Sequence, residues 1–121
     1  MSRRKLREME ARARARRDAA STAALALFAD GRYDDGEALI RAIDADIQGG
    51  IMIERCYLRH LQDLVSTGAD AARCRMVYDR GVAWAIGNSP TPHTADEAER
   101  NAVAAAEGRA RFTSVLGMEP A

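Results

Sequence analysis

The sequence has few residues that favour β-strands or interrupt helices. No run of five or more positions alternates β-branched or aromatic residues, and the 121 residues include only three prolines. Alanine and arginine, which enter helices at little cost, are abundant, whereas lysine occurs only at Lys5. The composition therefore predicts an all-α fold. A chain of this length forms one domain and can bury roughly two-thirds of its unfolded surface.

Long apolar runs and a cysteine framework are also missing. No stretch approaches the ~20 apolar residues that a membrane-spanning helix requires, so we expect no membrane partner. Cys56 and Cys74 are too few for a disulfide-rich scaffold and fit a reducing compartment. We therefore predict a cytoplasmic protein.

Opposite charges are separated along the chain, although the net charge is zero. Residues 1–17 carry eight basic side chains against Glu8 and Glu10, a charge of +6, and residues 18–121 carry −6. We call residues 1–17 the arm, and residues 18–121, which we predict to form a single helical domain, the body. This separation predicts an acidic partner for the arm, or association of the arm with the body.

The arginines of the arm also suit phosphate groups. On a helix, Arg3, Arg7 and Arg14 share one face, with Arg4 and Arg17 nearby, and such a strip would neutralise several phosphates. No aromatic residues are interleaved to stack on single-stranded bases. Nucleic-acid binding through these five arginines is therefore one hypothesis, and a solvated tail that aids solubility is the other.

Apolar periodicity and glycine positions predict five helices. The first covers residues 3–29, carries a sparse apolar stripe through Leu6, Met9 and Ala13, and ends at Gly31. We expect the others at residues 34–48, 51–66, 70–86 and 95–116, separated by Gly49-Gly50, Gly68 and the segment from Gly87 to Pro90.

Capping residues mark two of the predicted helix starts. Asp34 with Glu37 fits an acidic variant of the capping box, and Thr94 with Glu97 fits the usual form. The fifth helix has a stripe of mainly small residues that would allow close packing: Ala98, Ala102, Ala105, Ala106, Phe112 and Val115.

The first four helices are predicted to form two antiparallel hairpins, followed by a C-terminal helix. At an offset of 37 residues, Gly31 aligns with Gly68 and Ile40 aligns with Val77. Such an offset is typical of stacked helical hairpins, although any two amphipathic hairpins of equal length would also align.

The first hairpin resembles a tetratricopeptide repeat over some twenty residues. Gly31-Arg-Tyr33 fits the turn of that family, and Ile40 and Ile43 fall where its second helix packs. Gly36 occupies a small-residue position that usually holds alanine. The second hairpin matches poorly, with Asp70 and Arg73 at the positions of Tyr33 and Gly36. The resemblance implies a helical-repeat fold with a peptide-binding groove.

The sequence offers few residues for catalysis or metal binding. His60 and His93 are the bases expected to titrate near neutral pH, but no glycine-rich loop or oxyanion hole accompanies a Cys56–His60 pair. Both histidines with Cys56 and Cys74 could supply zinc ligands, yet their spacing is irregular. The acidic residues 30–37 do not follow the alternation of a calcium loop. We predict no enzymatic activity, no cofactor and no metal.

A helix-turn-helix is a further alternative for residues 51–86. Arg73, Arg75 and Arg80 would then lie on the second helix as DNA-reading residues. Nearby aspartates would repel phosphate, which favours a structural role for this segment.

These observations favour a small protein-interaction or regulatory module that acts by binding. Aromatic side chains anchor many interfaces, so we predict that the groove between the hairpins is lined by Phe28, Tyr33, Tyr57, Tyr78 and Trp84. The alternative is a nucleic-acid-binding regulator that uses the arm.

Overall fold

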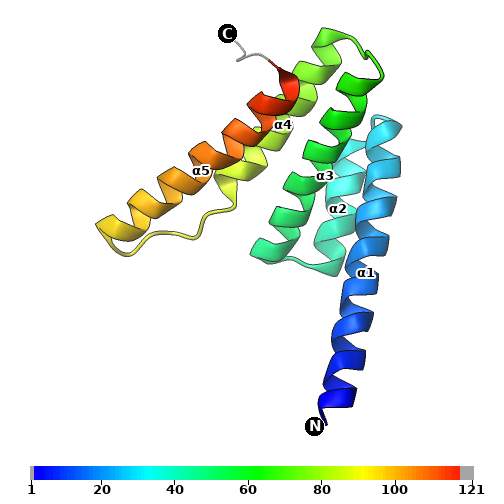
Figure 1. The fold of residues 1–121 in the computed structure, drawn as a ribbon, viewed down its shortest axis with the longest axis vertical. Helices are drawn as coiled ribbons and strands as arrows, with labels where there is room; N and C mark the ends of the chain where they lie inside the picture. The colour runs from blue at the N-terminus through cyan, green and yellow to red at the C-terminus, as the bar shows by residue number, and fades with distance from the viewer. Residues whose placement is uncertain (1, 118–121) are drawn as a thin grey trace.

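The computed structural model describes residues 2–117, which form five helices and no strand (Figure 1). The helices are α1 (Arg3–Ala29), α2 (Tyr33–Ile43), α3 (Ile47–Ser66), α4 (Ala71–Gly87) and α5 (Ala95–Leu116). The prediction of an all-α fold is confirmed. None of the helices within the described residues is both long and apolar enough to cross a membrane.

The central element of the fold is α3, which packs against each of the other four helices. α1 lies against α2, and α5 lies against α3 and α4 (Figure 1). The fully buried large side chains come from every helix, and α3 supplies three of them, Ile53, Tyr57 and Leu61. One continuous core therefore joins α1 and α2 to the other three helices.

α1 and α3 end in the same backbone motif, at the glycines where the sequence predicts helix ends. Gly31 and Gly68 have φ angles of +77° and +73°. The N–H of Gly31 donates to the carbonyl of Phe28, and the N–H of Arg32 donates to the carbonyl of Leu27, both at 2.9 Å. Equivalent bonds surround Gly68. This is the Schellman motif, which favours glycine because a side chain is strained at positive φ.

The predicted end of the second helix at Gly49-Gly50 is wrong. α2 ends at Ile43, and both glycines lie buried in the first turn of α3. A Cβ on Gly49 would collide with the carbonyl oxygen of Asp44, and a Cβ on Gly50 would collide with the side chain of Asn88. These glycines therefore permit close packing, and they do not stop a helix.

The capping box predicted at Asp34 and Glu37 is also wrong. α2 begins one residue earlier, at Tyr33, and its N-cap residue Arg32 makes no side-chain capping hydrogen bond. The two carboxylates instead accept hydrogen bonds from Arg80 of α4. A tertiary ion pair has replaced the local cap.

Two other predicted helix starts are confirmed. Asp70 caps α4 by accepting a hydrogen bond of 2.9 Å from the N–H of Arg73. Thr94 caps α5 by accepting one of 3.1 Å from the N–H of Glu97, whose carboxylate accepts a hydrogen bond from the N–H of His93.

The small-residue stripe predicted for the fifth helix does not pack along its length. Ala98, Ala102 and Ala106 are exposed, and the buried residues of α5 are Gly108 and Phe112 in its second half. The first half of α5 extends away from α3 (Figure 1). These alanines therefore have no neighbouring helix to pack against.

Candidate functional site

The aromatic residues predicted to line a partner groove lie mainly in the core. Four of the five are buried: Phe28, Tyr33, Tyr57 and Tyr78. Phe28 stacks on Tyr57 with ring centroids 4.3 Å apart. Trp84 is partly buried, with the guanidinium of Arg41 4.8 Å from its ring centroid. These side chains hold the helices together and do not form an open groove, because a partner at the surface would not reach the four buried rings.

A cluster of polar side chains, which we call the polar node, joins α2, α3 and α4. The hydroxyl of Tyr57 donates a hydrogen bond to the carboxylate of Glu37. Nη1 of Arg80 lies 3.1 Å from Oε2 of Glu37, 3.2 Å from Oδ1 of Asp34 and 3.4 Å from the Tyr57 hydroxyl. Burial raises the pKa of Tyr57, and Glu37 raises it further. The hydroxyl therefore remains a hydrogen-bond donor at neutral pH.

A second buried polar contact joins Tyr33 to His60. The Tyr33 hydroxyl and Nε2 of His60 are 3.2 Å apart. Burial lowers the pKa of His60, and the charge of Arg73 lowers it further, against a smaller opposing effect from Asp63. A neutral imidazole with one buried hydrogen-bond partner has a structural role here.

The cysteines and histidines weighed as zinc ligands are held by separate partners. Cys56 and Cys74 are buried free thiols, and each donates a hydrogen bond to a backbone carbonyl. His60 bonds to Tyr33, and His93 lies exposed before α5. Within residues 2–117, no three histidine, cysteine or acidic side chains are arranged to hold a metal ion.

The arginines proposed for DNA reading on α4 are occupied within the body. Arg73 donates to the backbone carbonyl of Ala29 at 3.1 Å, and Arg75 forms an ion pair of 3.1 Å with Asp79. Arg80 belongs to the polar node. Arg73 and Arg80 join α4 to other helices, and Arg75 pairs with an acid on α4 itself, which weakens the helix-turn-helix hypothesis.

Sequence analysis missed a buried acid on α3. Glu54 is 8% exposed and accepts hydrogen bonds from Arg111 at 3.1 Å and from Asn88 at 3.2 Å. These contacts join α3 to α5 and to the end of α4. The charge is satisfied by its partners, so the contact explains how α5 is held and offers no free chemical group.

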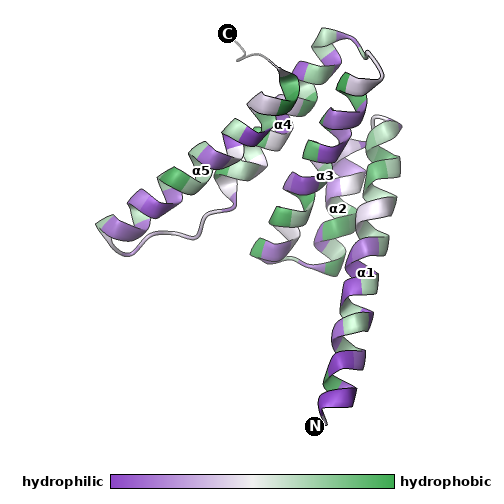
Figure 2. Cartoon of the chain, in the orientation of Figure 1, coloured by the Kyte–Doolittle hydropathy of each residue, from purple (hydrophilic) through white to green (hydrophobic). Residues whose placement is uncertain are grey.

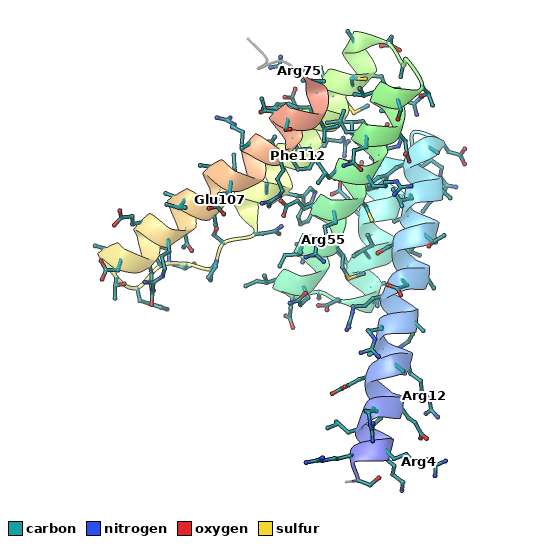
Figure 3. All side chains as sticks on the ribbon, viewed as in Figure 1. Arg4, Arg12, Arg55, Arg75, Glu107 and Phe112 are labelled. Carbon is teal, nitrogen blue, oxygen red and sulfur yellow. The ribbon has the colours of Figure 1, made fainter. Side chains whose placement is uncertain are left out.

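The arm, in contrast, is uncovered. α1 is one continuous helix, and its first half extends beyond the other helices, with Arg4 and Arg12 among the side chains along it (Figure 3). Hydrophilic residues dominate this half (Figure 2). The five arginines proposed as phosphate ligands are all exposed: Arg3, Arg4, Arg7, Arg14 and Arg17. Arg4 pairs with Glu8 at 3.4 Å, and this is the ion pair found within the described part of the arm.

The apolar stripe of α1 continues from the core into the arm. Ala20, Ala24 and Phe28 are buried against the body. Leu6, Met9 and Ala13 follow the same helical spacing toward the N-terminus, but Leu6 is 48% exposed and Met9 is 52% exposed. The body therefore covers only the second half of a longer packing stripe.

A cleft of about 640 Å³ lies between α1 and α3 where the arm meets the body. Its basic side chains are Arg17, Arg55 and Arg59, and its apolar wall includes Leu25, Ile51 and Met52. Sequence analysis did not find Arg55 and Arg59, because they lie opposite Arg17 only once α1 packs against α3. The four-residue spacing of Arg55 and Arg59 places them on one face of α3, which is the one local signal.

No protein-family model, curated protein or solved structure matches the chain. Its function is therefore inferred from its own residues.

Proposed function

We propose that the protein is an interaction or regulatory module whose binding element is the arm, and that its partner is an acidic amphipathic helix of another protein. The observation that carries this proposal is the apolar stripe of α1, which runs beyond the body and is flanked by arginines. A helix of complementary pattern would cover Leu6 and Met9 and neutralise the arginines beside them.

Three features support binding over catalysis. The side chains of the polar node bond to one another, and Tyr33 bonds to His60, so these polar groups already have partners within the body. The two cysteines are buried thiols, and burial raises the pKa of Cys56, which makes it a poor nucleophile. The exposed charge and the uncovered apolar residues meet on the arm. We also propose that the protein is cytoplasmic, since two cysteines that form no disulfide fit a reducing compartment.

Nucleic-acid binding is the second candidate, and the exposure of all five arginines favours it. Two features weigh against it. Phosphates make no use of an apolar stripe, and the body carries a charge of −6 that repels them. The two candidates therefore differ in whether Leu6 and Met9 contribute to binding.

Two full-length variants separate the candidates. One replaces Leu6 and Met9 by Gln without changing the charge, and the other replaces Arg3, Arg7 and Arg14 by Gln. Fluorescence anisotropy measures their binding to a designed acidic helical peptide of Leu and Glu and to duplex DNA, across a range of salt concentrations. An Ile86→Gln/Val103→Gln variant is the matched control, because it removes two apolar side chains exposed to a similar degree outside the arm.

We expect the peptide to lose affinity with either arm variant and to be unaffected by the control. DNA should bind weakly and only at low salt. A DNA complex that persists at physiological salt, is unaffected by the Leu6/Met9 change and shows a log–log salt slope of roughly −3 to −4, as about four phosphate contacts predict, would establish the second candidate instead.

A further inference from the structure

The cleft between α1 and α3 is lined by both basic and apolar side chains. Its volume of about 640 Å³ is within the usual range for small-molecule sites, roughly 300–1,000 Å³. We propose that the cleft binds a small ligand in which an anionic group, a phosphate ester or a carboxylate, is joined to a short apolar chain.

The anionic end of this ligand is specified by three arginines. Arg17 comes from α1, and Arg55 and Arg59 come from α3, so guanidinium groups approach the cleft from both walls. Arg59 forms an ion pair of 3.4 Å with Asp63, whereas Arg17 and Arg55 have no acidic partner among the described residues. Asp18 is the acidic residue of the lining, which leaves a charge of +2. Arginine binds phosphate and carboxylate oxygens in a bidentate manner, which suits both anions.

The apolar end is specified by the apolar side chains that line the same cleft. Met52 and Cys56 are buried, and Leu25 and Ile51 are partly exposed into the same space. The three side chains of α3 occupy positions i, i+1 and i+5, and Leu25 adds one position of α1. A fully hydrated anion would leave this surface unused, so the site fits an amphiphilic ligand better than inorganic phosphate.

The two cysteines provide a reporter within the native protein. Cys56 lines the cleft, and Cys74 is buried on α4 away from it. Cys56 is a buried thiol with a raised pKa, so its slow alkylation measures local opening between α1 and α3. A ligand bound in the cleft should slow this alkylation further, as followed by mass spectrometry, and leave the rate at Cys74 unchanged. The probe is n-octyl phosphate below its micellar concentration. Inorganic phosphate lacks the chain, and an octyl glycoside lacks the charge.

Calorimetric titration of the same probes into the full-length protein measures affinity. An Arg55→Gln change should weaken n-octyl phosphate binding by about tenfold, in line with a charge-assisted hydrogen bond. The matched control is Arg12→Gln, which makes the same change of charge on α1 outside the cleft (Figure 3). Neither residue belongs to the arm variants used above, so failure of this proposal and failure of the arm proposal are separate results.

Protection of Cys56 by n-octyl phosphate, with loss of affinity in Arg55→Gln alone, is the expected result. Equal binding of inorganic phosphate, equal binding of the octyl glycoside, equal losses in Arg12→Gln and Arg55→Gln, or no binding of n-octyl phosphate would each overturn the proposal.

Discussion

Gly36 on α2 is buried beneath a phenylalanine ring, and this contact predicts the effect of a single methyl group. A Cβ built on Gly36 would lie 2.5 Å from Cε1 and 2.7 Å from Cδ1 of Phe28, and 3.2 Å from the carbonyl oxygen of Ala24. Phe28 is fully buried and stacks on Tyr57 at 4.3 Å. The ring therefore has no free space into which it can retreat, and α1 would have to move away from α2.

Two opposing contributions set the size of the effect of Gly36→Ala. Alanine in a helix interior is favoured over glycine by about 1 kcal/mol. Overpacking a rigid core costs roughly 1–3 kcal/mol. The difference is a net cost of ~0–2 kcal/mol, and because the Phe28 ring is fully buried we expect Gly36→Ala to destabilise the protein toward the upper end of that range. Urea unfolding followed by far-ultraviolet circular dichroism measures this difference directly.

The same substitution in a Phe28→Leu background tests the cause. With the ring removed, the methyl group has space and the helix propensity of alanine should dominate, so Gly36→Ala should become neutral or stabilising by up to ~1 kcal/mol. If Gly36→Ala stabilises the wild-type protein, or costs the same in both backgrounds, the packing of Phe28 on α2 is not what requires glycine.

Three other predictions concern local strain, protonation and metal. Gly31→Val should cost ~1–2 kcal/mol by backbone strain, because φ is +77° and the space around a Cβ is open; Gly87→Ala, at an open position without positive φ, should cost nothing measurable. Burial lowers the pKa of His60 below its ordinary 6.5, and the charge of Arg73 lowers it further. As the pH falls, His60 is therefore protonated in the unfolded chain at a higher pH than in the folded protein. The stability from neutral His60 should be complete above pH 6.5 and decline as the pH falls below it, and His60→Gln should reduce that decline in urea titrations. Elemental analysis of protein purified without chelator should find no stoichiometric zinc; one equivalent that disappears in Cys56→Ser would contradict this.

Local signals in the sequence predicted helix starts and ends correctly where these depend only on the backbone and on nearby residues. The helix ends at Gly31 and Gly68, the helix start near Asp70 and the cap at Thr94 depend on neighbours within a few residues. The resemblance to a tetratricopeptide repeat and the 37-residue repeat remain predictions. Gly36, where that family usually has alanine, is explained in this chain by its contact with the Phe28 ring.

The errors arose where a distant residue decides the role of a local one. Gly49 lies against the backbone of Asp44 and reads in sequence as a helix stop. Glu37 is placed for a cap but bonds to Arg80, which is forty-three positions away. The two candidate binding regions, the arm and the cleft, also differ in whether local sequence predicts them. The run of basic residues predicted the arm, whereas the cleft exists only because α1 packs against α3.

The distribution of ion pairs gives the arm its distinct character. Among the described residues of the body, five of the ten arginines form ion pairs with acids, as Arg75 does with Asp79 and Arg111 with Glu54. In the arm, Arg3 and Arg7 are four positions apart, as are Arg12 and Arg16, and like charges at this spacing destabilise a helix by about 0.2–0.5 kcal/mol per pair. The arm thus has exposed apolar side chains and also repulsion between its arginines. An acidic helix would relieve both at once, whereas a hydrated polyanion would relieve only the repulsion, and this difference is why the charge-neutral change at Leu6 and Met9 separates the two kinds of partner.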